Sequence, residues 1–175
     1  MGVEIERKVL LVSDQWRTSV DYSHRMVQGY LGARDEGASV RVRITGDEAR
    51  LNIKGRTLGA RRLEFEYPVP LADAEVMLRE LAGTQVLAKT RHYIHHEGHR
   101  WEIDEFEGDN AGLIVAEIEL GSERESFVRP PWLGREVTDD PRYYNVCLVE
   151  TPYSVWPAQD GPSSKARRES DDSDV

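Results

Sequence analysis

Charged and apolar residues alternate with a period of two along much of this 175-residue chain. Six stretches place charges on alternate residues with mostly apolar residues between them: Glu4/Glu6/Lys8, Arg41/Arg43, Glu64/Glu66, Lys89/Arg91, Glu102/Asp104 and Glu117/Glu119. Successive side chains of a β-strand point to opposite faces. Each stretch therefore predicts a strand with one ionic face and one apolar face.

Strand patterns of this kind recur in eight segments, at about 3–10, 25–33, 38–45, 49–56, 62–68, 87–95, 99–106 and 113–121. Short links with turn residues, such as Asp35-Glu36-Gly37 and Gly46-Asp47-Glu48, make most neighbours antiparallel. The ionic face of a single strand is often simply exposed to solvent. Six such faces built from charged residues with little Ser or Thr favour instead a site that the strands share. We therefore predict an α+β fold, an eight-stranded antiparallel β-barrel whose lumen is polar and charged and can hold one small ligand.

Helical patterns flank and interrupt these strands. The segment LADAEVMLRELA (71–82) spaces its apolar residues for an amphipathic helix that covers the barrel's outer surface. Ser13-Asp14 resembles a helix start, and Asp140-Pro141 predicts an N-cap for a helix over about 141–149. The domain is expected to span residues 1–156, and residues 157–175 have too few large apolar residues to fold, so a disordered tail is expected there.

Composition narrows the function classes. A net charge of −9 argues against general nucleic-acid binding, which depends on a clustered positive surface. No apolar run approaches the ~20 residues that cross a bilayer, and the N-terminus lacks signal-peptide zones, so no membrane partner and a cytoplasmic location are expected. The single cysteine, Cys147, excludes an intramolecular disulfide and is expected to be structural.

The charges of the predicted lumen indicate its ligand. Its basic residues are Lys8, Arg41, Arg43, Lys54, Lys89 and Arg91, and its acidic residues are Glu4, Glu6, Glu64, Glu66, Glu102, Asp104, Glu117 and Glu119. Six basic minus eight acidic residues gives the lumen a net charge of −2. Like charges about 4 Å apart repel by about 4 kcal/mol even at an effective dielectric constant of about 20, so the charges cannot be left unpaired. The charges either neutralise each other or bind ligands of opposite sign. Because acids and bases occupy mostly separate strands, carboxylates suit Mg²⁺ or Mn²⁺ and the bases suit a polyphosphate.

The opening EIERK has the form ExExK, and with it the chain resembles the CYTH superfamily, the triphosphate tunnel metalloenzymes, in particular its short single-domain bacterial members. The likeness continues through QGYL (28–31), VRVR (40–43), LNIKG (51–55), EFEYP (64–68), KTRHY (89–93) and the stretches 101–120 and 131–145. This resemblance implies an eight-stranded antiparallel tunnel, a triphosphate-containing substrate and catalysis that depends on Mg²⁺ or Mn²⁺, with two ions expected.

The resemblance also implies roles for single residues. Metal ligands would be Glu4, Glu6, Glu117 and Glu119, followed by Glu102 and Asp104. The triphosphate clamp would be Lys8, Arg41, Arg43, Lys54, Lys89 and Arg91. Glu64 and Glu66 either orient basic side chains or touch metal, and both options stay open. Tyr30 is a candidate proton acceptor and, with Lys8, a candidate catalytic residue, although a tyrosine that only hydrogen-bonds or packs fits equally well, and His92 is expected on the outer face.

The function expected from these residues is metal-dependent hydrolysis of a triphosphate at a terminal phosphoanhydride bond. Inorganic tripolyphosphate ranks first because the sequence shows no marker for an organic group. Cyclisation of ATP, as in a class IV-type adenylate cyclase, and hydrolysis of thiamine triphosphate are the enzymatic alternatives. A non-catalytic module that binds polyphosphate or nucleotide is the other class, and a homodimer is compatible with the sequence.

Overall fold

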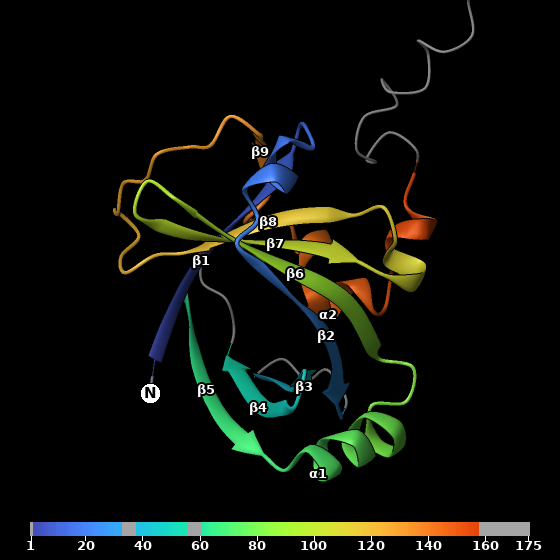
Figure 1. Ribbon diagram of the computed structural model, residues 1–175. Helices are drawn as coiled ribbons and strands as arrows, with labels where there is room; N and C mark the ends of the chain where they lie inside the picture. The colour runs from blue at the N-terminus through green and yellow to red at the C-terminus, as the bar shows by residue number, and fades with distance from the viewer. Residues whose placement is uncertain (1, 33–37, 56–60, 158–175) are drawn as a thin grey trace, which may run out of the picture.

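The computed structural model describes residues 2–32, 38–55 and 61–157, and within them nine strands form one antiparallel sheet (Figure 1). The strands are β1 (Gly2–Leu11), β2 (Tyr22–Leu31), β3 (Ala38–Thr45), β4 (Glu48–Gly55), β5 (Arg61–Val69), β6 (Val86–His96), β7 (His99–Phe106), β8 (Ile114–Glu119) and β9 (Leu133–Glu136). Their order is β5-β4-β3-β2-β6-β7-β8-β1-β9, and β1 also pairs with β5. The eight predicted strands are confirmed as β1–β8, and the pairing of β1 with β5 joins the two ends of their order. The predicted antiparallel barrel is therefore confirmed.

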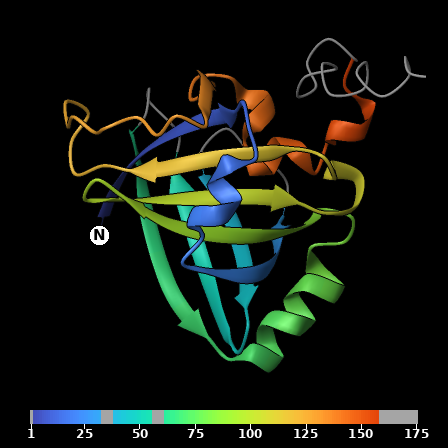
Figure 2. The same ribbon diagram turned by 45° about the horizontal axis from the view of Figure 1, so that its top comes forward.

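Apolar side chains on the outer face pack under two separate covers. Over β1, β6, β7 and β8, a cluster that includes Val9, Ile103 and Ile118 packs with Trp16 of the 3₁₀ turn η1 (Gln15–Ser19) and with Trp132. In Figure 2 this turn, drawn in blue, lies across the strands of that half. Because the outer face is filled by apolar groups, the charged residues of alternate parity point inward, as the period-two pattern predicts.

The predicted helix over 71–82 is confirmed and covers the other half of the barrel. It consists of α1 (Leu71–Val76) and one π-helical turn, η2 (Met77–Leu81), and Ala74 packs on Val42 and Ala49 of β3 and β4. The end of this helical segment also lies close to β2, because a Cβ atom added to Gly29 would lie only 2.7 Å from the Cβ atom of Ala82. Glycine at position 29 is therefore what lets this helical segment approach β2.

The C-terminal segment closes one end of the lumen with apolar side chains. Leu87, Phe106 and Val115 extend the inner faces of their strands and pack against Tyr143 and Leu148. These two residues belong to η4 (Pro141–Tyr143) and α2 (Asn145–Leu148), which precede η5 (Tyr153–Val155). The lumen is consequently apolar at this end and charged beyond it.

The prediction of one continuous helix over 141–149 is wrong. Asp140 caps η4 as predicted, because its side chain accepts a hydrogen bond from the Arg142 amide, but Tyr144 is extended with φ −76° and ψ 132°. In an unbroken helix, positions 143 and 148 would lie about 140° apart around the axis. The break allows Tyr143 and Leu148 to face the barrel end together.

Three other expectations have mixed outcomes. The helix start at Ser13-Asp14 is confirmed as η1, whereas the four-residue strand β9, which pairs with β1, was not predicted. The turn at 35–37 and nearly all of the expected tail, residues 158–175, lie outside the described residues. Within the described part of the chain, no helix has the length and apolar character needed to cross a membrane.

Candidate active site

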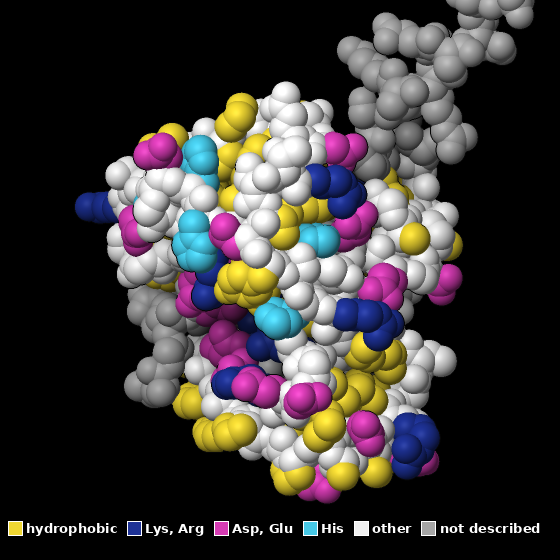
Figure 3. Space-filling model, viewed as in Figure 1, with side chains coloured by type: hydrophobic (Ala, Val, Ile, Leu, Met, Phe, Trp, Pro, Cys, Tyr) yellow, Lys and Arg dark blue, Asp and Glu magenta, His cyan; other side chains and the backbone are white. Residues whose placement is uncertain are grey.

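A cavity of about 710 Å³ opens among the inward-facing side chains of the barrel. Figure 3 shows the hollow from outside, with acidic and basic side chains gathered in its depth. Its charged lining residues are Glu4, Glu6, Arg41, Arg43, Arg50, Lys54, Glu64, Glu66, Arg91, Arg100, Glu102, Glu117 and Glu119. Eleven of the fourteen charged residues predicted for the lumen are in this set.

The other three predicted charged residues, Lys8, Lys89 and Asp104, are buried and form ion pairs. Tyr30 also points inward and is 7% exposed, and its hydroxyl accepts a hydrogen bond from Gln28 Nε2 at 3.2 Å. Tyr30 is not among the lining residues. His92 lies on the outer face as predicted, 2.7 Å from Ser23 Oγ through Nδ1 and against the ring of Trp16.

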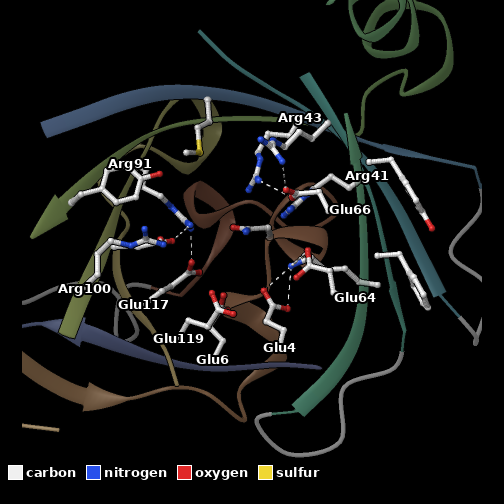
Figure 4. A pocket seen from close by; sticks show the side chains of 18 residues that line it. Glu4, Glu6, Arg41, Arg43, Glu64, Glu66, Arg91, Arg100, Glu117 and Glu119 are labelled. Carbon is white, nitrogen blue, oxygen red and sulfur yellow. Dashed lines mark hydrogen bonds and ion pairs between the residues drawn. The ribbon is translucent and has the colours of Figure 1, made fainter. Parts of the chain in front are cut away.

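Carboxylates crowd one side of the cavity. Figure 4 shows Glu4, Glu6 and Glu119 pointing into the cavity from β1 and β8, and Glu6 is the register partner of Glu119. Glu4 also accepts from Lys54 Nζ, at 2.9 and 3.1 Å. Burial raises the pKa of Glu119, and the negative charges of the surrounding carboxylates, Glu4 first among them, raise it further. Glu119 has no ion pair within the described ranges. This side therefore repels added negative charge and suits a cation.

Two buried lysines beside the cavity differ in their electrostatics. Burial alone would lower the pKa of Lys8, but the carboxylates of Glu117 and Glu6 outweigh burial and raise it, so Lys8 stays a cation. Its Nζ lies 2.5 Å from Glu6 Oε1 and also contacts Glu117. Burial and the neighbouring Arg91 charge lower the pKa of Lys89 to about 8 despite its ion pair with Asp104.

Arg91 joins three acids of β7 and β8. Its Nε and Nη2 each donate to an Asp104 oxygen at 2.7 Å, and its other contacts reach Glu102 and Glu117. Asp104 is fully buried and Glu117 is 3% exposed. Lys8, Arg91 and Lys89 hold the pKa of Glu117 well below its ordinary value, against the opposing effect of burial. Asp104 and Glu117 therefore hold basic side chains in place.

Arginines gather on the other side of the cavity. Burial, and then the charges of Arg41 and Arg91, lower the pKa of Arg43. Arg41 is 6% exposed, and its Nε donates no hydrogen bond within the described part of the chain. Arg41 and Arg43 therefore place two repelling guanidinium groups against one space, and forked donors of this kind suit an anion.

Sequence reasoning missed several lining residues. Arg50 and Arg100 share strand parity with Lys54 and Glu102, and that parity would have placed both in the lumen. With them the lumen contains eight basic and eight acidic residues, so its balance is zero instead of −2. Tyr93 also lines the cavity, and Asn145 reaches it from α2, which no local pattern indicates.

No three His, Cys, Asp or Glu side chains in the described residues are already arranged around a metal-sized space. The fit to a cation depends instead on the donor set: carboxylate oxygens without a sulfur ligand, which hard divalent ions prefer. Repulsion at Glu119 indicates that a cation bound beside Glu4 and Glu6 would be stabilised.

Comparison with known proteins agrees with this geometry. The CYTH domain model matches residues 2–144. An inorganic triphosphatase of Acetivibrio thermocellus is 44% identical over 153 residues, covering 87% of this chain and 97% of that protein. An inorganic triphosphatase of Nitrosomonas europaea is 32% identical over 149 residues, covering 83% and 96%. A crystal structure of an inorganic triphosphatase superposes with a TM-score of 0.62 at 30% identity, covering 85% of this chain and 95% of that one.

Proposed function

This chain belongs to the CYTH domain family, and from that premise we propose that it hydrolyses the terminal phosphoanhydride bond of inorganic tripolyphosphate. The observation that carries the proposal is the grouping of like charges on two sides of one cavity: Glu119 lies beside Glu4 and Glu6, and Arg43 lies beside Arg41. Partial burial and then the neighbouring carboxylates raise the pKa of Glu119, and burial and then the neighbouring arginines lower the pKa of Arg43. A polyphosphate bound with a divalent cation relieves both repulsions, since its phosphates meet the arginines and its cation meets the carboxylates. The two inorganic triphosphatases that match nearly the whole chain support the same substrate.

The acidic residues divide into two groups by their burial and by the number of basic side chains that each one holds. Glu4, Glu6 and Glu119 would hold the cation, Mg²⁺ or Mn²⁺, which supplies charge neutralisation at the phosphoryl group and an acidified water. Asp104 and Glu117 instead orient Lys89, Lys8 and Arg91, because each of these two acids is buried and accepts from two cations. Glu4 and Glu6 each pair with one lysine, Lys54 and Lys8, and Glu119 pairs with none among the described residues. Their prediction as metal ligands, like that of Glu102 and of a second ion, stays a prediction.

Phosphoryl transfer depends mainly on positioning and on electrostatic stabilisation of the phosphate oxygens. Arg41 and Arg43 can provide both, since they face the cavity with forked donors. Lys8 acts as a fixed positive charge, because its raised pKa removes it as a proton acceptor at neutral pH. The role of Tyr30 as proton acceptor stays a prediction.

Arg41 gives the most direct test of the substrate clamp. Because Arg41 forms no ion pair with the described acids, alanine there leaves no carboxylate without its partner. A charge-assisted hydrogen bond contributes about 1.5–3 kcal/mol, so kcat/KM for tripolyphosphate with Mg²⁺ should fall about ten- to a hundredfold in Arg41→Ala. Phosphate release is measured on a panel of tripolyphosphate, ATP, thiamine triphosphate and pyrophosphate with Mg²⁺ and with Mn²⁺.

The matched control is Arg25→Ala on the outer face, where Arg25 pairs with Glu107 at 2.9 Å and is 61% exposed. Turnover of this variant should stay within about twofold of wild type. Wild-type protein that retains tripolyphosphate and Mg²⁺ without releasing phosphate would support the non-catalytic binding module instead.

A second candidate substrate, a triphosphate that carries a flat ring, is favoured by an aromatic stack beside the cavity. Tyr93 lines the cavity next to Arg91 and Arg100, and Tyr22 stacks on it at 4.5 Å with an interplanar angle of 18°. His24 meets both rings at their edges, and Tyr22 is 44% exposed. Aromatic stacking on a nucleobase contributes about 1–3 kcal/mol.

If the stack holds a nucleobase, Tyr22→Ala should lower kcat/KM for ATP about tenfold and leave tripolyphosphate within about twofold. Chromatography of the products separates hydrolysis, which gives ADP and phosphate, from cyclisation, which gives cyclic AMP and pyrophosphate. Equal effects on both substrates would restrict the stack to a structural role.

A further inference from the structure

Asn52 lies behind the basic side of the cavity and is not itself one of the lining residues. It lies on β4 between Arg50 and Lys54 on the same face, and its register partners are Arg41 on β3 and Glu66 on β5. Its side chain is fully buried. A neutral amide at this position is therefore surrounded by charged neighbours that all face the cavity.

The amide nitrogen of Asn52 bridges the two carboxylates of β5. Nδ2 donates to Glu64 Oε1 at 2.9 Å and to Glu66 Oε2 at 2.5 Å. Both amide hydrogens are used in this way, and an amide flip would turn its oxygen toward two carboxylates. The hydrogen-bond network thus fixes the orientation of the side chain.

The bridged carboxylates in turn hold basic side chains. Glu64 lies 3.2 Å from Lys54 Nζ, which it shares with Glu4 at 2.9 Å. Glu66 accepts from Arg43 at 3.2 Å and from Arg50 at 2.9 Å. Burial opposes ionisation of Glu66, but the Asn52 hydrogen bond and these arginines outweigh it and lower its pKa. Each carboxylate therefore stands between one amide hydrogen and at least one cation.

We propose that Asn52 is a positioning residue: its amide fixes Glu64 and Glu66 as holders of Lys54, Arg43 and Arg50, and so keeps this wall available for the triphosphate instead of for metal. The inference rests on the proposed function, since it concerns the anion-binding half of the same cavity. It also decides between the two roles that the sequence left open for Glu64 and Glu66. A third carboxylate at position 52 would draw the bases inward and lower their availability to the substrate.

The experiment is a four-protein cycle of wild type, Asn52→Asp, Glu64→Gln and the double variant. The double variant exchanges amide and carboxylate between β4 and β5, which restores the net charge and one amide–carboxylate hydrogen bond between positions 52 and 64, while Glu66 keeps only its arginine donors. In Asn52→Asp we expect KM for tripolyphosphate with Mg²⁺ to rise about tenfold with kcat within about threefold, since clamp binding weakens by about 1.4 kcal/mol. In the double variant KM should fall at least about fivefold from that value, by recovery of the charge-assisted hydrogen bond.

A readout without turnover accompanies the kinetics. Tripolyphosphate in the presence of EDTA should raise the melting temperature of wild type and raise that of Asn52→Asp less, because only the basic wall binds under these conditions. If Asn52→Asp does not fold, Asn52→Ser replaces it. Serine donates a single hydrogen bond, so KM should rise about threefold.

An unchanged KM in Asn52→Asp or Asn52→Ser would overturn the inference. So would a double variant no better than Asn52→Asp, or a loss in kcat alone, which would place Asn52 with the reacting groups. A fall in melting temperature with an unchanged KM would leave Asn52 a purely structural residue. If wild type neither binds nor hydrolyses tripolyphosphate, the proposed function fails, whereas equal binding by wild type and Asn52→Asp rejects only the role of Asn52.

Discussion

Replacing Arg91 by alanine should lower the free energy of unfolding by about 3–5 kcal/mol and reduce turnover to the limit of detection. Arg91 is 8% exposed and contacts three acids, of which Asp104 is fully buried. Without the guanidinium, Asp104 keeps only Lys89 as a cationic partner among the described residues, and Glu117 keeps Lys8. Removing one member of a buried ion pair leaves an uncompensated charge, which costs far more than the loss of an exposed pair.

Urea denaturation and kcat/KM for tripolyphosphate measure the two effects of Arg91→Ala. For a chain of this size, the expected loss corresponds to a fall of roughly 6–20 °C in melting temperature. Arg91→Lys keeps the charge without the forked donor, so its stability should lie between those of wild type and alanine. Arg100→Ala is the matched control, because the Arg100 side chain is 50% exposed and forms one ion pair with the described acids, to Glu102 at 2.9 Å.

The stability of Arg100→Ala should fall by less than about 1 kcal/mol. Equal losses in Arg91→Ala and Arg100→Ala would show that burial of the Arg91 network contributes nothing to stability. A folded Arg91→Ala with near-normal turnover would remove Arg91 from the site.

Strand parity explains why so much of this cavity could be predicted from sequence. Side chains of Arg41 and Arg43, or of Glu117 and Glu119, must share a face once their strands form, whatever the rest of the chain does. The apolar residues between them then decide which face is covered, because that face packs under α1 or η1. Local sequence thus determines both the strands and the inward direction of the charges.

The lining residues that the sequence analysis missed do not fit the pattern that was searched for, although two of them obey strand parity. On the inner face of β4, the neutral Asn52 stands between Arg50 and Lys54. On β7, the inner-face neighbour of Arg100 is the acid Glu102. Neither arginine therefore forms a pair of like charges on alternate residues. Asn145 depends on how the segment after β9 folds back over the barrel end, which strand periodicity does not report. The division of carboxylates into cation-facing and base-holding groups also requires distances, since Glu117 and Glu119 have the same local pattern but opposite pKa shifts.

The substitution Glu119→Gln should abolish most of the turnover while leaving the metal-free protein at least as stable as wild type. The pKa of Glu119 is raised in the folded state, so its ionised form destabilises the fold at neutral pH. Removing that charge should therefore stabilise the metal-free protein slightly, by less than about 1 kcal/mol because the side chain is partly exposed. Turnover with Mg²⁺ should fall at least about a hundredfold, since metal assistance contributes several kcal/mol.

The sign of the stability change separates a cation site from a structural ion pair. Without metal, the advantage of Glu119→Gln should be largest above the raised pKa of Glu119 and should vanish as pH falls below the ordinary glutamate value, where both side chains are neutral. Adding Mg²⁺ should stabilise wild type more than the variant, because a bound cation relieves the repulsion from Glu4 and Glu6. Glu107→Gln, which removes an outer-face partner of Arg25, should change neither turnover nor the response to Mg²⁺. A metal-free Glu119→Gln that is clearly less stable than wild type would mean that Glu119 pairs with a cation of the protein itself, and the proposal of a metal site on the acidic side of the cavity would be rejected.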